Sequence, residues 1–354
     1  MKKLKKLISI TACAAIAALT ACAPKPAAPS ADAKAPGSPG APLASESGGI
    51  TIGVVQYVQH EALDKCYAGF LDALSDNGYK TDGSAEGFKS VTIDYQNALG
   101  DSSNLSAIGD RFVSEGAGLI FAITTPAAEA MAGKTTEIPI VASAVTSYTE
   151  ANLVDSDEAP GGNVTGTSDM NPVAAQIDFA RELVPNLKTV GLLYNAGEAN
   201  SVLQINIAKK AIEDSGLAWT EATVANTNDV LQATQALADK CEAIYIPTDN
   251  IVASSMSTVY SVTEGAKLPT ICGEAGMVLS GGLATLGIDY EKLGYQSGLM
   301  AIDVLNGKKP AEMPIQTQTN YQVTINGQAA DEMGFAVPDK YKDSVIYPEK
   351  GAEQ

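Results

Sequence analysis

The chemistry open to this chain is restricted by its single histidine, His60. A Ser-His-Asp arrangement would have to use that residue, and the sequence has no GxSxG nucleophile elbow, no P-loop and no HExxH motif. No Cys/His/Asp cluster accompanies His60, so we predict neither a metal site nor a cofactor. We therefore interpret the chain as a binding protein and not an enzyme, with His60 either a ligand contact or a structural side chain. An exported α/β hydrolase dependent on His60 is the alternative that the missing motifs argue against.

Two threonines at a predicted helix start could bind an anion. Thr125 before Pro126 is typical of an N-cap followed by the first helical residue, with Thr124 just before it. In the simpler interpretation these residues only cap a helix. In the functional one, free backbone N–H groups, the helix dipole and the hydroxyl groups bind a carboxylate. Ser201, near the start of a later helix, could do the same from the opposite side.

Asp249 is the candidate partner for a cation. It follows a predicted strand and Pro247, where it could simply cap the helix that begins at Ser254 or form an Asx-turn. An α-ammonium group needs a charged acceptor once water is excluded, so a carboxylate opposite Thr124 and Thr125 would recognise an amino acid zwitterion. We favour that role.

Four further side chains in the same kind of loop are weaker candidates. Glu198 and Glu274 are reserve acceptors, and each could equally be a solvated loop acid. Tyr57 or Tyr148 could stack on an aromatic ligand, or could cover a loop. The sequence does not choose between these roles.

The elements that position these residues repeat as strand, loop and helix. Apolar runs at 51–55, 91–95, 119–123 and 140–144 alternate with amphipathic stretches at 61–77, 101–115 and 127–133. The pattern restarts with expected strands at 189–194, 219–224, 243–246 and 270–272, and expected helices at 199–215, 229–240 and 254–266. Such alternation predicts parallel sheets covered by helices.

About 300 residues are too many for one α/β core, so we predict two doubly wound lobes. The first comprises 50–166 and 290–314, and the second comprises 167–289 and 315–347. Crossovers are expected at the glycine-rich stretch from 160, at 281–289 before a long helix at 290–305, and at 321–325 before a helix at 328–333. Asn171 and Pro172 are read as the cap and first residue of a helix after the first crossover. Three crossovers predict a hinge.

Open α/β sheets bind ligands at the carboxyl ends of their strands, where loops enter the next helices. These loops supply the predicted ligand-binding residues, which are Gln56, Tyr57, His60, Thr124, Thr125, Val145, Tyr148, Asn195, Glu198, Asn200, Ser201, Thr248, Asp249 and Glu274.

The first 22 residues predict export. Four lysines precede an apolar stretch at 7–19 that is too short to span a bilayer, and Leu19-Thr20-Ala21-Cys22 follows. A cysteine at this position resembles a bacterial lipobox, in which Cys22 is acylated after removal of signal residues 1–21. An ordinary signal peptide with a chance cysteine is the alternative. Residues 22–49, rich in proline and alanine, would then form a membrane tether.

Composition excludes one class of partner. Loss of the four signal lysines takes the formal net charge from −18 to −22, and no Lys/Arg cluster remains to bind a phosphate backbone, so we expect no nucleic acid partner. After Cys22 only Cys66, Cys241 and Cys272 remain, without CxxC spacing. We expect them to be buried thiols.

The loop residues together resemble one family. The ABC-transporter substrate-binding lipoproteins, whose better-known members look like tryptophan or tyrosine receptors, share the order and spacing of these segments over essentially all of Ile50 to Pro338. The segments are Gln56…His60-Glu61-Ala62-Leu63-Asp64, Thr124-Thr125-Pro126-Ala127-Ala128, Gly161-Gly162-Asn163-Val164-Thr165-Gly166, Leu193-Tyr194-Asn195…Glu198…Asn200-Ser201 and Pro247-Thr248-Asp249-Asn250.

The resemblance implies a type I periplasmic-binding-protein fold that closes on a small solute and delivers it to an ABC permease. Family members often have Asp-Pro where this chain has Ser147-Tyr148, which leaves the fold in place and changes the expected ligand surface. We expect a monomer that is anchored by lipid on Cys22 to the outer face of a bacterial membrane. Its expected ligand is an amino acid, and an aromatic amino acid is a candidate. A ligand-sensing lipoprotein that docks on a signalling receptor would use the same fold and site.

Overall fold

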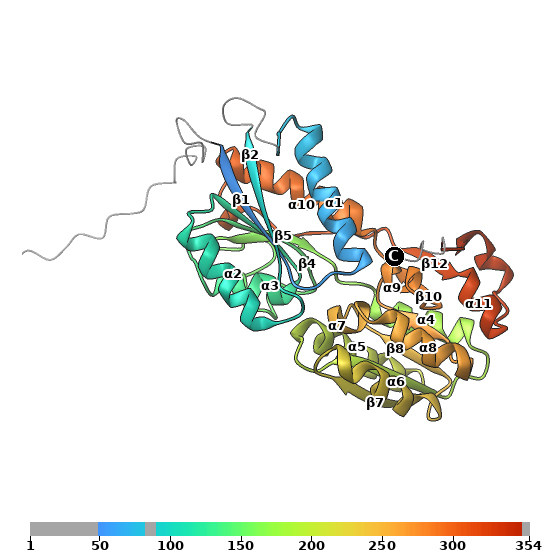
Figure 1. Cartoon of the computed structure of the whole chain (residues 1–354). Coiled ribbons are helices and arrows are strands. Elements are labelled where there is room, and N and C mark those ends of the chain that lie inside the picture. Colours follow the sequence, from blue (N-terminus) through green and yellow to red (C-terminus); the bar gives the residue numbers. More distant parts are fainter. Residues whose placement is uncertain (1–48, 82–89, 349–354) are drawn as a thin grey trace, which may run out of the picture. The chain divides into compact units, whose positions relative to one another are not determined.

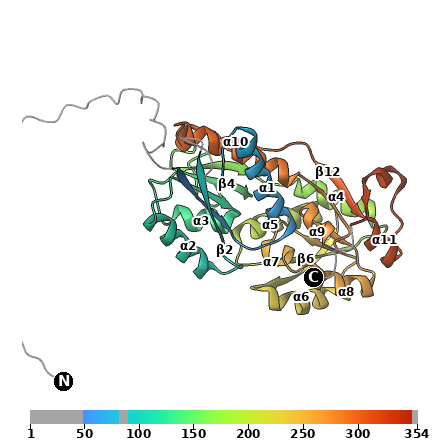
Figure 2. The ribbon, with the colours of Figure 1, turned by 45° about the horizontal axis from the view of Figure 1, so that its top comes forward.

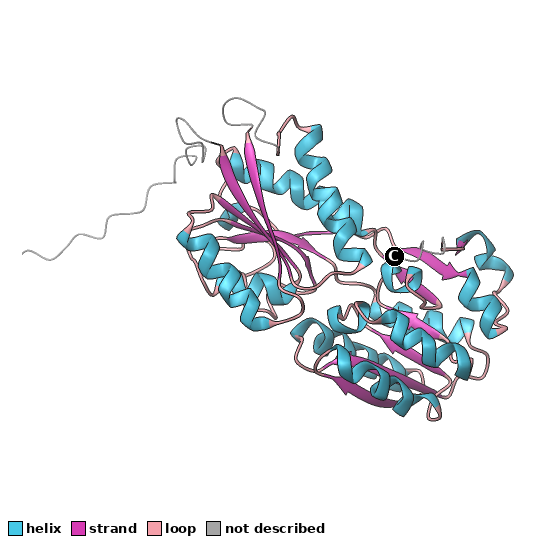
Figure 3. Cartoon of the chain, viewed as in Figure 1, coloured by secondary structure: helices cyan, strands magenta, loops and turns pink. Residues whose placement is uncertain are grey.

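The computed structural model describes residues 49–81 and 90–348, in which two parallel sheets are each covered by helices (Figures 1 and 3). The predicted signal peptide, Cys22 and the tether up to residue 48 lie outside these ranges. Within the described ranges, no helix is long and apolar enough to cross a bilayer.

The first sheet has six parallel strands in the order β11-β5-β4-β3-β1-β2. They are β1 (Ile50–Gln56), β2 (Val91–Asn97), β3 (Leu119–Ile123), β4 (Ile140–Val145), β5 (Val164–Ser168) and β11 (Gln316–Thr317). Every residue of β3 and β4 is buried, as expected for largely apolar sequences in a sheet covered on both faces.

The second sheet has seven strands in the order β13-β12-β10-β9-β8-β6-β7, with only the β10–β12 pair antiparallel. They are β6 (Thr189–Asn195), β7 (Ala218–Val224), β8 (Ala243–Ile246), β9 (Thr270–Cys272), β10 (Ala284–Gly287), β12 (Gln322–Asn326) and β13 (Val345–Ile346). Strands β12 and β13 are added after the chain has left this sheet at the end of β10, passed through α10 (Tyr290–Leu305) and β11, and returned.

Helices divide between the sheets. The first sheet, with α1 (Glu61–Asp76), α2 (Ser102–Ser114), α3 (Thr125–Ala132) and α10 (Tyr290–Leu305), is called here the first lobe. The second lobe is the second sheet with α4 (Val173–Leu183), α5 (Ala199–Asp214), α6 (Val230–Ala238), α7 (Asn250–Ala253), α8 (Met256–Ala266), α9 (Ala275–Leu279) and α11 (Gly327–Met333). Helices α1 and α10, more than 200 residues apart in the chain, lie side by side (Figures 1 and 2).

One apolar core of the first lobe lies between its sheet and this helix pair, and another lies on the opposite face under α2 and α3. Phe70 of α1 stacks on Phe121 of β3 with ring centroids 3.9 Å apart, and both rings are fully buried. Stacking and burial of these rings hold the helix pair on one face of the sheet.

The chain passes between the lobes in three segments, at 169–172, 288–289 and 318–321. The predicted fold class, two parallel-sheet lobes joined by a three-segment hinge, is confirmed. Asn171 ties two of these segments together, because its Oδ1 accepts from the Ile288 N–H at 3.2 Å and its Nδ2 donates to the Asp169 carbonyl at 3.0 Å. This residue was predicted to cap α4, and that was wrong: Pro172 occupies the N-cap position without a side-chain bond.

Two boundaries also differ from those predicted. Val164–Ser168, expected as part of an extended crossover, is strand β5 of the first sheet. Gln316–Thr317, assigned to the second lobe, pairs in parallel with β5. Both residues of this short strand are exposed and polar, so no hydrophobic pattern marks it in the sequence.

Candidate functional site

Strand ends from both lobes meet around one polar cavity. From the first lobe and its crossovers it is lined by His60, Leu63, Ala144, Thr146, Asp169 and Tyr290, and from the second lobe by Asn200, Thr248, Asp249, Asn250, Glu274 and Met277. The lining includes three carboxyl side chains and no lysine or arginine. Such a site favours a ligand that carries positive charge over a simple anion. No group of acids, cysteines or histidine suited to hold a metal ion occurs in residues 49–81 and 90–348.

Asp249 lines this cavity, but its own lobe already occupies its oxygens. The side chain is fully buried and accepts from the Asn195 N–H at 2.5 Å, the Ser201 hydroxyl at 2.7 Å and the Val252 N–H at 2.9 Å. It is the N-cap of α7, so it does cap a helix, although this helix begins at Asn250 and not at Ser254 as predicted. Burial raises the pKa of this carboxyl, and the three donors oppose the shift.

Glu198 lies near Asp249 and holds the loops around it. Its carboxylate accepts from the side chains of Asn195, Asn200 and Asn250 and from two backbone N–H groups at the start of α7. Burial and the neighbouring Asp249 charge raise the pKa of Glu198 to about 8. Glu198 is not among the residues that line the cavity, and its hydrogen bonds tie the start of α5 to the start of α7.

Asn200 lies in the first turn of α5 and reaches the cavity. Its Nδ2 donates to the Thr248 carbonyl at 2.9 Å and to Glu198 at 3.2 Å, whereas its buried Oδ1 has no hydrogen-bond partner. Thr248 is held in turn by Gln204, whose Nε2 donates to the Thr248 hydroxyl at 2.6 Å. These contacts fix one wall of the cavity.

His60 faces that wall from the first lobe. It occupies the N-cap position of α1 but makes no capping bond, and both ring nitrogens are buried without a hydrogen-bond partner. Burial lowers its pKa to about 4, and the Asn250 side chain and the Asp64 charge only partly oppose this shift. The imidazole is therefore neutral at physiological pH.

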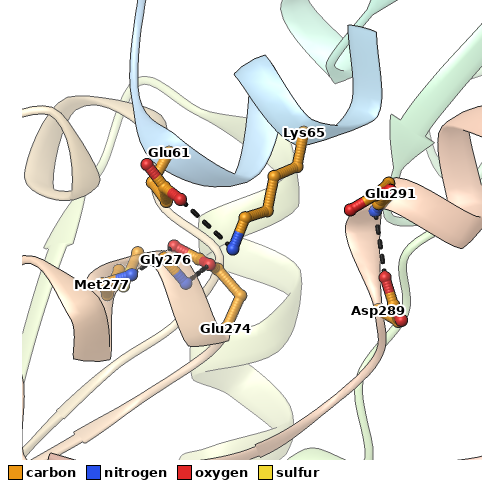
Figure 4. A network of polar contacts seen from close by, with 7 residues as sticks. All are labelled: Glu61, Lys65, Glu274, Gly276, Met277, Asp289 and Glu291. Carbon is orange, nitrogen blue, oxygen red and sulfur yellow. Dashed lines mark hydrogen bonds and ion pairs between the residues drawn. The ribbon is translucent and has the colours of Figure 1, made fainter. Parts of the chain in front are cut away.

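Glu274 closes the end of the cavity nearest the hinge. It is the N-cap of α9, where its carboxylate accepts from the Gly276 N–H and from the Met277 N–H at 2.8 Å. Across from it, Lys65 of α1 pairs with Glu61 at 3.1 Å (Figure 4). Burial raises the pKa of Glu274 to about 7, although both backbone donors and the Lys65 charge oppose the shift.

We expect the stability of the ligand-free protein to depend on Glu274 between pH 5 and 8. Because the folded pKa is raised above the unfolded value, the folded state binds the extra proton, and stability falls as pH rises through this range. Glu274→Gln should flatten that fall by about 1–3 kcal/mol in urea unfolding. Glu137→Gln, at an exposed position, is the control. If the free energy of unfolding changed equally with pH in both variants and the parent, a buried, protonatable Glu274 would be contradicted.

Asp169 and Tyr290 are site residues that the sequence analysis missed. The Tyr290 hydroxyl donates to Asp169 at 2.6 Å, and the Thr146 hydroxyl donates to the other carboxyl oxygen at 3.0 Å. Burial raises the pKa of Asp169. The signal that could have found them is their position at two crossovers, since residues beside a hinge border the cleft.

The predicted anion site is placed differently. Thr124, and not Thr125, is the N-cap of α3, in a backbone conformation with φ of 99°. Thr125 lies in a small neighbouring cavity with Ser147, Glu150 and Ala151 of the first lobe and Ala199, Asn200 and Leu203 of α5. Asn200 borders both cavities, so they adjoin.

The remaining predicted residues support the site without lining the polar cavity. Gln56 donates to Asp64 at 2.9 Å, Val145 is a buried residue at the end of β4, and the Tyr57 hydroxyl donates to the Gly100 carbonyl at 3.0 Å. Asn195 and Ser201 hold Asp249, as described above.

Tyr148 is directed into the first lobe. Its hydroxyl donates to the carbonyls of Ala142 and Thr167, and the side chain is fully buried. Gly166 makes room for it, because a Cβ there would stand 2.4 Å from the Tyr148 oxygen and 1.8 Å from the Ala142 carbonyl oxygen. The structure thus gives Tyr148 a packing role, and Ser147 of the same loop lines the small cavity that contains Thr125.

Two parallel-sheet lobes whose strand ends enclose one polar cavity define a solute-binding protein of the type I periplasmic fold. Residues 51–345 match the family described as ABC transporter substrate binding protein, and the chain belongs to that family. It is 42% identical over 275 residues to a tyrosine-binding protein of Clostridioides difficile. The alignment covers 78% of each chain.

Two solved structures are informative together. A domain from Streptococcus pneumonia in complex with L-Trp has a TM-score of 0.79 at 37% identity, covering 84% of this chain and all of that one. A ligand-free, open substrate-binding protein from Clostridium difficile has a TM-score of 0.64 at 38% identity, covering 85% of this chain and all of that one. At nearly equal identity, the described lobes match the ligand complex better than the open form.

Proposed function

We propose that this protein is the amino acid receptor of an ABC importer, with an aromatic amino acid as its ligand. The acidic cavity between the lobes carries the proposal, because three carboxyl side chains and no basic one favour a ligand with an ammonium group. The names of the similar proteins, a tyrosine-binding protein and a complex with L-Trp, support an aromatic side chain.

Binding would work by a shift of population between open and closed lobes. A ligand that touches both lobes stabilises only the closed form, and the permease can distinguish that form from the open one. The better match to the L-Trp complex than to the open relative supports a closed form accessible to this chain.

The N-terminal residues complete the proposal. Acylation of Cys22 and a proline-rich tether would keep the receptor at the outer face of the membrane, beside its permease. Mass spectrometry of the protein extracted from membranes tests this directly: a diacylglyceryl group on Cys22 supports the anchor, and an unmodified mature N-terminus contradicts it.

Thermal unfolding of the detergent-solubilised full chain tests the ligand class. L-tyrosine or L-tryptophan at 100 times its Kd should stabilise the folded state by about 2.7 kcal/mol and raise Tm by several degrees. Phenylpropionate, which lacks the ammonium group, is the matched control and should give a smaller shift. If sugars or nucleosides raise Tm and no amino acid does, the proposed function is wrong.

A further inference from the structure

Three polar atoms around the cavity lack the partner that buried polar atoms almost always have. They are both ring nitrogens of His60 and the Oδ1 of Asn200. Among the described residues only one other buried side-chain atom shares this state, the Thr285 hydroxyl, which lines a second cavity that has Glu274 and Tyr290 in common with the first. The large majority of buried side-chain polar atoms in proteins have a hydrogen-bond partner, either protein or ordered water, so a cluster of three around one cavity indicates bonds that a bound ligand or water supplies.

The orientation of the Asn200 amide is fixed by its neighbours. Its Nδ2 faces the Thr248 carbonyl and the Glu198 carboxylate, and both are acceptors. Exchange of the amide nitrogen and oxygen would place an oxygen against both, so the oxygen must point into the cavity. A ligand atom at this point must therefore be a hydrogen-bond donor.

His60 presents the opposite requirement. A neutral imidazole has one N–H donor and one lone pair, and neither makes a hydrogen bond of ordinary geometry within the protein, although the Asn250 side chain lies close enough to raise the pKa of the ring. A carboxylate needs a donor, and the cavity has no lysine or arginine to provide one. Among the described lining residues, the ring N–H of His60 is a donor with no acceptor in the protein, and it comes from the lobe opposite Asn200.

His60 and Asn200 come from different lobes, from the loop after β1 and the first turn of α5. We propose that the ligand bridges them, with its ammonium group on the Asn200 Oδ1 and its carboxylate on the His60 ring N–H. This inference rests on the proposed amino acid ligand and assigns its two charged groups to neutral side chains. The buried acids Asp169, Asp249 and Glu274 then attract the ammonium group electrostatically over a longer distance and need not contact it.

A cycle that removes one group from the protein and one from the ligand tests the pairing. Binding is measured for whichever of L-tyrosine and L-tryptophan the full chain binds more tightly, and for its methyl ester, which keeps the ammonium group but has no carboxylate charge. His60→Leu should weaken binding of the amino acid by about 10- to 100-fold and binding of the ester by less than about threefold. Gln59→Leu changes the exposed neighbour and should alter neither.

The second half of the cycle concerns Asn200. Asn200→Ala should weaken binding of the amino acid about 10-fold or more but leave its deaminated analogue, the arylpropionate, within about threefold of the parent. Thermal melting of each variant without ligand separates loss of contact from loss of folding. Equal losses for both ligands of a pair would overturn the assignment, whereas failure of the parent to bind any amino acid would overturn the proposed function itself.

Discussion

Gly276→Ala should weaken binding of the amino acid ligand about 5- to 100-fold while the lobes remain folded. A Cβ at this position would stand 2.8 Å from the backbone nitrogen of Ala62 and 3.0 Å from the Cβ of Glu61. Both atoms belong to α1 in the first lobe, whereas Gly276 is in α9 of the second (Figure 4). The clash therefore opposes closure and is relieved by opening.

The cost follows from ordinary overpacking. An extra methyl group in a tight contact costs about 1–3 kcal/mol, and here the penalty falls on the closed form alone. A third close atom, the Glu274 Oε2 at 2.8 Å, belongs to the same lobe and is the far end of a side chain that can move. Small-angle X-ray scattering should show a radius of gyration that contracts less on ligand addition than in the parent.

Gly265→Ala is the matched control. Gly265 is also a helical glycine of the second lobe, in α8, and a Cβ there would meet no atom within 4 Å. It should leave Kd unchanged and slightly stabilise the protein, since alanine favours a helix. If Gly276→Ala binds as tightly as Gly265→Ala, the two helices do not meet this closely in the bound protein.

Much of the architecture follows from the sequence for a simple reason. Strand β3 is an unbroken apolar run and β4 is interrupted only by Ser143, and a parallel sheet covered on both faces favours such runs. The loops that follow such strands gather at one edge of the sheet, so the sequence also predicts that His60, Asn200, Thr248, Asp249 and Glu274 line one cavity.

The features that the sequence did not predict depend on contacts between residues far apart in the chain. Tyr290 meets Asp169 across 121 positions, and no local pattern reports that pairing. Helix α9 has five residues, too few for a periodic signal, so the capping role of Glu274 was hidden. Strand β5 reads Val-Thr-Gly-Thr-Ser, and its polar side chains are buried because hydroxyl partners such as Ser143 and Ser297 meet Thr167 there.

The orphan atoms of His60 and Asn200 show a different limit. Sequence analysis can place a polar side chain in a loop, but whether each of its atoms has a partner depends on the whole surrounding structure. Asp249 and Asn200 were both candidates on the same grounds. The structure separates them, because Asp249 has three donors within its lobe and the Asn200 oxygen has none.

Asp249→Ala should therefore lower the free energy of unfolding of the ligand-free protein by about 2–4 kcal/mol. The change leaves the Asn195 N–H, the Ser201 hydroxyl and the Val252 N–H buried without an acceptor and removes the cap of α7. Relief of the repulsion between Asp249 and Glu198 offsets part of this loss. Asp249→Asn keeps one acceptor oxygen and should lose less.

Urea unfolding without ligand measures this effect, and Asp101→Ala provides the comparison. Asp101 is also an N-cap, of α2, and its carboxylate accepts from the Ser103 N–H at 2.7 Å on an exposed surface. Water can replace a lost bond there, so the loss of stability should be smaller. If Asp249→Ala is instead as stable as Asp101→Ala without ligand and fails only in binding, Asp249 is the direct partner of the ligand ammonium, and the assignment of that group to Asn200 must be abandoned.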